Sequence, residues 1–375
     1  MTTWKTYRAE DYCLKVTDGT HDSPKPQAEG RYLITSKHLK SSGIDFSSAN
    51  KICEEDYQKI IQRSKVEQYD ILFSMIGTVG NIHRVTIPIV DFAVKNMGIF
   101  KMGGDANKSL WMYYWLQSPI AQEYIQSRIT GSTQGYLTLG NLRDFPVCVP
   151  SLAEQRRIAG ILGAIDDKIE NNRRINTNLE LQAQALYKQW FVVNRNDDWE
   201  TLMLDDVATL SAGGDKPQIC SEQKTLECNI PIYSNGIDNE GLYGYTNNPR
   251  ITEDSITISA RGTIGFVSLR TEPYVPIVRL ISVVPTYKNV SAYFLYLWAL
   301  TQNISGTGTT QQQLTVPAFR TTKIVVPSQE ALIKFNQVVK PIFDSIRQNK
   351  KKNETLATLR DTLLPKLMSG EIITK

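Results

Sequence analysis

Two long helical stretches of this chain repeat each other, and this repeat limits the folds open to it. In residues 151–193, apolar or small residues recur at alternating steps of three and four, the heptad-like seam of a long helix. Taken as one helix, Glu154–Phe191 would be about 57 Å long at 1.5 Å per residue, too long for an ordinary packing helix. The seam recurs 177 residues later. Its positions Ile165, Ile169, Asn172, Asn176, Leu179, Ala183, Leu186 and Trp190 correspond to Ile342, Ile346, Asn349, Asn353, Leu356, Arg360, Leu363 and Leu367.

The globular stretches that precede each helical stretch repeat as well. The matched segments are 4–20 with 199–215, 77–80 with 262–265, 109–116 with 291–298, 131–134 with 308–311, and 149–151 with 326–328. Their offset falls from 195 to 177, as expected when loops differ in length. We therefore predict an α+β fold in which two repeated mixed α/β domains are joined by two long helices with pseudo-twofold symmetry. The predicted segments are 1–150, 151–194, 195–327 and 328–375.

Local patterns add a few elements to the first domain. Strand-like runs lie at 31–35, 70–75 and 145–150, and an aromatic-rich helix is expected from Ser109. The segments Gly77–Gly80 and Gly262–Gly265 are too short for phosphate-binding loops and are expected to be tight turns.

The order of the segments predicts that the two helices run antiparallel, because the second helix must return along the first. Asn172 and Asn176 would then lie level with Asn353 and Asn349. Asparagines inside an apolar seam cost stability but fix register, and we expect these four to do so, with a solvated position at the edge of the seam as the alternative. Pro341 should kink or restart the second helix, and its start, at Pro341 or before it, stays open.

Composition narrows the function only a little. The net charge of +4 is weak evidence for any partner, although its excess lies in the helical segments and includes Lys350–Lys352. Five scattered cysteines and only three histidines argue for reduced thiols and against a zinc site. A charged N-terminus and a longest apolar run of nine residues, Ala292–Leu300, predict a cytoplasmic protein without a membrane span.

Motifs of catalysis are missing from the sequence. It contains no phosphate-binding loop of the GxxxxGK[ST] type, no GxGxxG turn and no Asn- or Asp-Pro-Pro-aromatic tetrapeptide of amino-methyltransferases. Glu222-Gln223-Lys224 has the ExK form of some nucleases, with Asp215 nearby, but such a tripeptide is common by chance. The three histidines, His21, His38 and His83, have no counterparts in the second repeat. We expect a binding module without a metal site.

Loops of both repeats carry residues that suit DNA. Asn and Gln suit adenine, Arg and Lys suit guanine, and hydroxyl groups suit phosphate, although any polar loop contains such residues. The candidates in the first repeat are Thr20, His21, Thr35, Ser36, Lys37, Ser132, Thr133 and Gln134. The candidates in the second repeat are Lys216, Ser234, Asn235, Arg261, Thr309, Gln311 and Gln312.

End to end, the chain resembles the specificity subunit of type I DNA restriction-modification systems. The resemblance rests on Leu152–Ile158 (LAEQRRI), which leads into Ile165–Ile169 (IDDKI), and on Leu363–Ile372 (LLPKLMSGEI). It implies two target recognition domains that each read one half of a bipartite, asymmetric site in double-stranded DNA. It also implies helices that set the gap between the half-sites and dock two modification (methyltransferase) subunits.

The resemblance places the chemistry in other subunits. The modification subunits would hold S-adenosylmethionine and methylate adenine N6 after flipping the base. Restriction subunits, with ATP and Mg, would complete a nuclease for phage defence, and this chain would bind no cofactor itself. The second helix lacks the LAEQRR start, which leaves docking there open. The alternatives are a two-headed protein adaptor without DNA readout and a nuclease.

Overall fold

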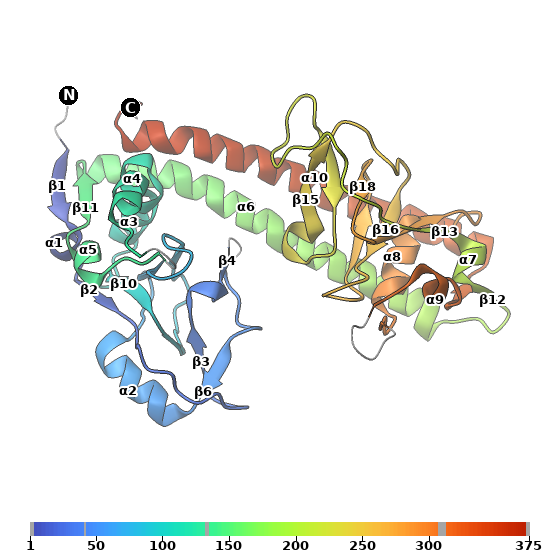
Figure 1. The fold of residues 1–375 in the computed structure, drawn as a ribbon, viewed down its shortest axis with the longest axis horizontal. Coiled ribbons are helices and arrows are strands. Elements are labelled where there is room, and N and C mark those ends of the chain that lie inside the picture. Colours follow the sequence, from blue (N-terminus) through green and yellow to red (C-terminus); the bar gives the residue numbers. More distant parts are fainter. Residues whose placement is uncertain (1–3, 41–42, 132–134, 307–312, 373–375) are drawn as a thin grey trace. The chain divides into compact units, whose positions relative to one another are not determined.

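The computed structural model describes residues 4–40, 43–131, 135–306 and 313–372. The chain divides into two compact units, of which unit 1 comprises Met1–Glu170 with Lys352–Lys375 and unit 2 comprises Asn171–Lys351. Each unit therefore contains one globular region and about half of each long helix (Figure 1). None of the described helices is long and apolar enough to cross a membrane.

The globular region of unit 1 is built from small sheets. The four-stranded sheet has the order β2 (Lys15–Asp18), β10 (Met97–Lys101), β7 (Ile71–Ser74), β8 (Ile82–Arg84). The three-stranded sheet has the order β6 (Asn50–Ile52), β3 (Arg31–Ile34), β9 (Phe92–Val94). The two-stranded sheets are β1 (Lys5–Arg8) with β11 (Pro146–Val149) and β4 (Leu39–Lys40) with β5 (Gly43–Ile44). The strands expected at 31–35, 70–75 and 145–150 are thus confirmed as β3, β7 and β11.

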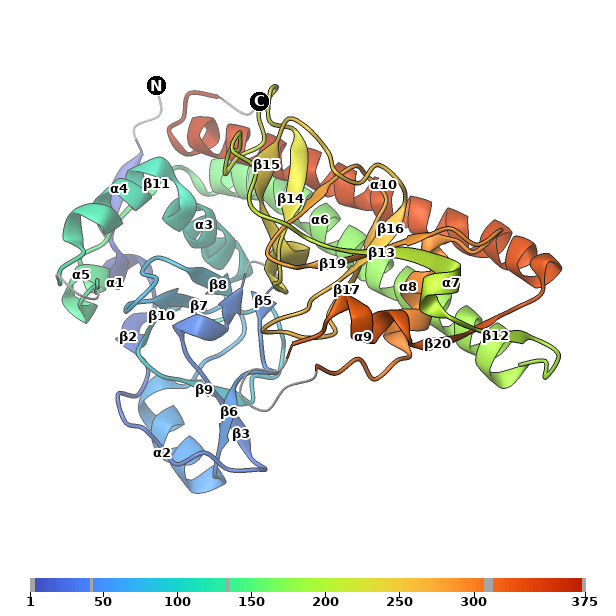
Figure 2. The ribbon, with the colours of Figure 1, turned by 45° about the vertical axis from the view of Figure 1, so that its right-hand side comes forward.

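Helices cover these sheets. They are α1 (Ala9–Tyr12), α2 (Glu54–Ser64), α3 (Ala106–Gln117), α4 (Pro119–Arg128), α5 (Leu139–Arg143) and the 3₁₀ turn η1 (Ser36–His38). α2 packs beside β9, with Tyr57 and Ile60 on its buried face (Figure 2). α3 begins three residues before the expected Ser109, because the side chain of Asp105 caps it by accepting from the backbone N–H groups of Asn107 and Lys108.

Unit 2 repeats the three sheet types with the same strand orders. Its four-stranded sheet is β13 (Ala208–Ala212), β19 (Ile281–Pro285), β16 (Ser255–Ile258), β17 (Val267–Arg270). Its other sheets are β15 (Leu242–Thr246), β14 (Ile230–Tyr233), β18 (Val275–Pro276), and β12 (Glu200–Met203) with β20 (Lys323–Val326). Its helices are α7 (Leu204–Val207), η3 (Asp238–Gly241), α8 (Ala292–Leu300) and α9 (Val316–Arg320). The repeat found in the sequence is therefore a repeat of the fold.

The matched glycine turns have the same conformation in both units. Gly77 and Gly80 have φ of 80° and 96°, and Gly262 and Gly265 have φ of 68° and 85°, values that glycine adopts without strain. The backbone N–H of Gly80 donates to Ser74 O and that of Gly265 to Ser259 O, both at 3.0 Å. The expected tight turns are confirmed.

The long helices are α6 (Leu152–Tyr187), which ends in the π-helical turn η2 (Lys188–Val193), and α10 (Gln329–Met368). In unit 1 the seam residues Ile158 and Leu162 of α6 share the hydrophobic core with Leu364 and Leu367 of α10. In unit 2 the ring of Phe191 packs 4.7 Å from that of Phe335. Each half-helix is thus part of the core of its own unit.

The start of the second helix, which the sequence left open, lies before Pro341, because α10 begins at Gln329 and passes through Pro341 as one helix. Of the two effects expected of Pro341, a kink or a restart, the restart is therefore wrong. Proline removes one backbone N–H, which leaves the carbonyl of Gln337 without its usual partner. Both residues are exposed, so water can bond that carbonyl and the helix tolerates the proline.

Candidate DNA interface

The sequence-predicted residues of unit 1 gather at one end of its four-stranded sheet. β2 and β7 both pair antiparallel with β10, so their carboxyl ends lie where β10 begins. β3 runs parallel to β9, and β9 leads through Lys95 and Asn96 into β10, which brings the carboxyl end of β3 to the same place. We define edge 1 as residues 19–23, 35–38, 75–80 and 95–96.

Backbone hydrogen bonds close edge 1. The N–H of Thr20 donates to Val94 O at 3.0 Å, that of Asn96 donates to Thr20 O at 3.0 Å, and that of Lys95 donates to Ile34 O at 2.8 Å. The loops approach so closely that a Cβ on Gly19 would lie 2.3 Å from Val94 O. Only glycine fits there.

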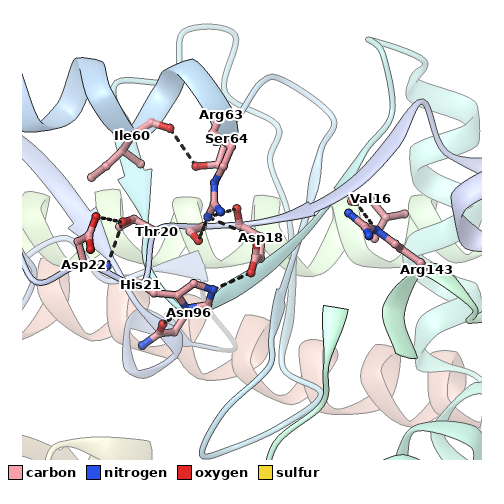
Figure 3. A network of polar contacts seen from close by, with 11 residues as sticks. Val16, Asp18, Thr20, His21, Asp22, Ile60, Arg63, Ser64, Asn96 and Arg143 are labelled. Atoms are coloured by element: carbon pink, nitrogen blue, oxygen red, sulfur yellow. Dashed lines mark hydrogen bonds and ion pairs between the residues drawn. The ribbon is translucent and has the colours of Figure 1, made fainter. Parts of the chain in front are cut away.

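A polar network holds the side chains of edge 1 in place (Figure 3). His21 Nε2 lies 2.9 Å from Oδ2 of the buried Asp18, and His21 Nδ1 lies 2.9 Å from Asn96 Oδ1. Arg63, on α2, donates to Gly19 O at 2.6 Å and pairs with Asp18 at 3.4 Å. The exposed imidazole of His21 is thus held between Asp18 and Asn96.

The second loop of edge 1 is a short 3₁₀ turn. The backbone N–H of Thr35 donates to His38 Nδ1 at 2.9 Å, and burial lowers the pKa of His38, which keeps that nitrogen available as an acceptor. Ser36 is half-buried and Lys37 is exposed. Next to this turn, Lys95 donates to the hydroxyl of Ser23.

Unit 2 builds the corresponding edge with the same backbone contacts. The N–H of Val278 donates to Gly214 O at 2.9 Å and that of Ile277 to Tyr233 O at 2.9 Å, as Asn96 and Lys95 do in unit 1. A Cβ on Gly213 would lie 2.7 Å from Ile277 N. We define edge 2 as residues 213–216, 234–235, 260–265 and 277–279.

The candidates on edge 2 differ in how free their side chains are. Asn235 donates from Nδ2 to Val278 O at 2.7 Å and accepts from the N–H of Ala260 at 2.7 Å, so its amide joins two loops of the edge. Arg261 is exposed and donates to Gln313 at 3.1 Å. The ammonium of Lys216 lies 5.1 Å from the ring centre of Tyr243. Hydrogen bonds to Cys220 and Tyr243 raise the pKa of Lys216 and keep it charged.

Some candidates have no structural account. Ser132, Thr133, Gln134, Thr309, Gln311 and Gln312 lie outside the described residues. The segments that follow them are described and join the edges: the N–H of Leu137 donates to Met75 O at 2.9 Å, and that of Leu314 donates to Ala260 O at 3.0 Å.

Sequence reasoning missed the turns that complete each edge. Asn96 has φ of 54°, and Val278 and Arg279 have φ of 53° and 61°. The one signal was an asparagine between two strand-like runs, since Asn tolerates the left-handed conformation. Arg63 and Asp18 were missed because their pairing joins distant parts of the sequence.

The exposed charges at the two edges are largely cationic. Lys37 lies at edge 1 with Arg63 beside it, and Lys216, Arg261 and Arg279 lie at edge 2, whereas each edge has one exposed carboxylate, Asp22 and Asp215. Guanidinium, ammonium, amide and hydroxyl groups on rigid loops can donate to phosphates and to base edges. Among the described residues no three His, Cys, Asp or Glu side chains gather as a metal site.

The predicted asparagines lie where the helices meet. In unit 2, Asn349 Nδ2 donates to Asn176 Oδ1 at 2.9 Å and Asn176 donates to Ile346 O at 3.4 Å. In unit 1, Asn353 donates to Ile169 O at 3.3 Å. Asn172 is only 2% exposed, so the alternative of a solvated position at the edge of the seam is excluded for this residue.

Two repeated mixed α/β domains, each with an edge of rigid polar loops and each packed on antiparallel helices, define a class of DNA specificity proteins. The chain belongs to the family described as type I restriction modification DNA specificity domain, whose sequence model matches residues 4–181 and again 196–358. It is a specificity subunit that serves DNA sequence recognition, and specificity subunits are non-catalytic components of type I systems that bind DNA and assemble with other subunits.

Particular relatives agree with this family. The chain is 29% identical over 302 residues to the type I restriction enzyme MjaIX specificity subunit of Methanocaldococcus jannaschii, covering 72% of this chain and 70% of that one. It is 24% identical to the HindI specificity subunit of Haemophilus influenzae, covering 83% and 88%. The type I S subunit from M. genitalium shares the fold, with a TM-score of 0.55, 17% identity and coverage of 98% and 96%.

Proposed function

We propose that edge 1 and edge 2 each read one half of a bipartite, asymmetric DNA site. The observation that carries this proposal is that one loop scaffold is built twice with the same backbone hydrogen bonds but different side chains. Residues 1–150 and 195–327 would then be the two target recognition domains. Edge 2 has Asp215 where edge 1 has His21, and Val278 where edge 1 has Asn96. Because these side chains differ, the two half-sites would differ in sequence.

Each edge combines two kinds of contact. The exposed cations Lys37, Lys216 and Arg279 suit phosphates, which supply affinity and salt dependence. Hydroxyl groups at Ser36 and Ser234 suit base edges, which supply specificity. Thr20 is buried and bonded to Asp22, and His21 is held between Asp18 and Asn96, so these two candidates would support edge 1. Asn235 would act as a support for edge 2, because both ends of its amide are already bonded within the loops.

The helices 151–194 and 328–375 would set the spacing between the half-sites. α6 and α10 each contribute residues to both units, so a change in their lengths would change the spacing between the half-sites. The Asn176–Asn349 pair would hold the register of this assembly, since a polar pair in an apolar seam disfavours shifted alignments.

The same helices carry matched exposed stripes that would dock the two modification subunits. Ile161 on α6 is 40% exposed, and Val338, its equivalent on α10, is 43% exposed. In the same stripes Arg157 corresponds to Lys334 and Ala164 to Pro341, and all four are exposed. Two patches with one chemistry at equivalent positions fit two copies of one partner. These subunits would hold S-adenosylmethionine, and restriction subunits using ATP and Mg would join through them.

The test of recognition is co-expression with the methyltransferase encoded beside it, followed by a map of N6-methyladenine. We expect one bipartite motif with a fixed gap. One heptad inserted at matched points of both helices should change the gap and leave the half-sites unchanged. Methylation by the chain alone, or no bipartite motif, would refute the proposal. Absence of salt-sensitive DNA binding in the complex would favour a protein adaptor.

The test of docking is aspartate substitution in the stripes. Ile161→Asp and Val338→Asp should each remove one methyltransferase subunit from the complex, and the double substitution both, as measured by light scattering after size exclusion. Leu226→Asp, at a fully exposed loop position, is the matched control and should leave two subunits bound. Two bound subunits in the double variant would contradict this site.

A further inference from the structure

The turns β9–β10 and β18–β19 hold side chains in a conformation that costs free energy. Asn96 and Val278 occupy equivalent positions, with φ of 54° and 53°. The left-handed region costs an ordinary residue roughly 1–2 kcal/mol, and a β-branched residue such as Val278 is a true outlier there, whereas asparagine tolerates this conformation. Glycine would adopt the same turn freely.

Packing does not explain why side chains are kept there. Val278 is 48% exposed, and Asn96 is partly buried. The turn itself is fixed by backbone groups, because Thr20 and Ile34 accept from Asn96 and Lys95, and Gly214 and Tyr233 accept from Val278 and Ile277. A strained, exposed side chain on a rigid turn points to a use at the surface.

In edge 1, neighbouring residues orient the amide of Asn96. Its Oδ1 faces His21 Nδ1 at 2.9 Å, while His21 Nε2 faces Asp18, which Arg63 pairs at 3.4 Å. The Nδ2 end points away from this network (Figure 3), and within the described part of the chain it has no partner. One end of the amide is therefore anchored, and the other is presented.

We propose that these two turns are base-reading elements, Asn96 through hydrogen bonds to a base edge and Val278 through contact with a thymine methyl group. His21 is the positioning residue for Asn96. This inference rests on the proposed function and adds the residues that distinguish the half-sites. The presented Nδ2 group of Asn96 is a donor, which matches an acceptor on a base edge such as adenine N7, and an apolar side chain matches the C5 methyl of thymine.

The experiment substitutes glycine at each turn in the full chain, co-expressed with the methyltransferase. Val278→Gly should roughly keep the melting temperature, because relief of strain offsets the larger unfolded-state entropy of glycine. Asn96→Gly should lower it only modestly, through loss of the contact with His21. Each should lower discrimination at one base pair by about 5- to 100-fold, each in a different half-site, as measured by methylation rates on a library of site variants. Asn289→Gly is the control: Asn289 also has a positive φ of 62° but follows the opposite end of β19.

His21→Ala tests the positioning role. His21→Ala should lower discrimination at the same base pair as Asn96→Gly does. The double variant should discriminate no less well than Asn96→Gly alone, because both substitutions remove the same interaction. A merely structural His21 would lower the melting temperature and leave the base preference unchanged.

The outcomes separate this inference from the proposed function. If the wild-type complex methylates no bipartite site, the proposed function fails. If the wild type methylates such a site and both glycine variants discriminate as it does, this inference alone is overturned. Should a glycine variant fold poorly, Asn96→Ala and Val278→Ala answer the same question.

Discussion

The Asp166–Arg360 pair in unit 1 gives a quantitative test of how the helices are held. Arg360 Nη1 lies 2.9 Å from Asp166 Oδ1, and the hydroxyl of Tyr114 donates to Asp166 Oδ2 at 2.7 Å. Both charged side chains are only about a quarter exposed, at 26% and 27%. At the repeat positions, 177 residues away, unit 2 has Ala183 and Phe343, which lie in its hydrophobic core.

The cost of Arg360→Ala follows from this geometry. A charge-assisted hydrogen bond contributes about 1.5–3 kcal/mol, and an exposed ion pair about 0–1 kcal/mol. Partial exposure places this pair between the two, so we expect unit 1 to lose about 1.5 kcal/mol. Asp166→Ala should cost about 2 kcal/mol, because it leaves the hydroxyl of Tyr114 without its acceptor and Arg360 with the exposed Asp361 alone.

A transplant from unit 2 provides the compensating change. Tyr114→Phe, Asp166→Phe and Arg360→Ala together replace the polar cluster by the apolar pair that the repeat already uses. Exchanging a buried ion pair for apolar side chains is often neutral or stabilising, so the triple variant should regain stability to within about 1 kcal/mol of wild type.

Urea unfolding measures these differences. Lys59→Ala removes the exposed Glu55–Lys59 pair of unit 1 and is the matched control, with an expected loss below about 0.5 kcal/mol. If Arg360→Ala costs no more than this control, the pair contributes as little as a surface ion pair and the reasoning is refuted.

Three further predictions follow from other contacts. Burial lowers the pKa of His83 to about 4. Between about pH 6.5 and 4 the unfolded state therefore binds more protons than the folded state, and the free energy of unfolding falls as the pH falls, by at most about 3 kcal/mol. His83→Gln should flatten this loss relative to wild type in unfolding at pH 7 and pH 4.5, and an unchanged slope would exclude His83 as its source. The guanidinium of Arg270 lies 3.5 Å from the ring centre of Tyr233 and donates to Glu240 O at 2.6 Å. Lysine cannot make both contacts, so Arg270→Lys should lower the free energy of unfolding in urea by about 2–4 kcal/mol. A loss under about 1 kcal/mol would contradict this. Asn176→Ala should lower the free energy of unfolding by about 1 kcal/mol, because Asn349 loses its acceptor. The double variant Asn176→Leu with Asn349→Leu should be at least as stable as wild type, because a polar pair in an apolar seam fixes register at a cost in stability. A less stable double variant would show that the pair is a net stabiliser.

The sequence was sufficient to predict features that depend on local pattern. The heptad seam, the strands β3, β7 and β11 and the turns Gly77–Gly80 and Gly262–Gly265 follow from spacing, and the repeat doubled the information available for each. The start of the second helix, at Pro341 or before it, stayed open from the sequence, because the effect of a proline depends on whether the freed carbonyl reaches water, which residue type alone does not reveal.

The composition of the edges was harder to predict, because they form from contacts between distant segments. Asn235 looked like a base reader by residue type, yet its amide joins Val278 and Ala260. Asn96 and Val278 drew no attention, since a positive φ is imposed by the pairing of two loops rather than by the residue itself. Residue type therefore suggested the kind of contact, and only the fold distinguished supporting from presented side chains.

The departure of Arg360 from the repeat also bears on how the chain avoids pairing with a second copy. Within each unit, α6 meets α10, so Asp166 faces Arg360, while Ala183 and Phe343 share the core of unit 2. If the α6 helices of two copies paired antiparallel in the same register, Asp166 would face Ala183 and lose its cation. If two α10 helices did so, Arg360 would face Phe343. Asp166 would be left without a cation in the first alternative, and Arg360 would keep only the exposed Asp361 in the second, so the broken symmetry favours pairing of α6 with α10.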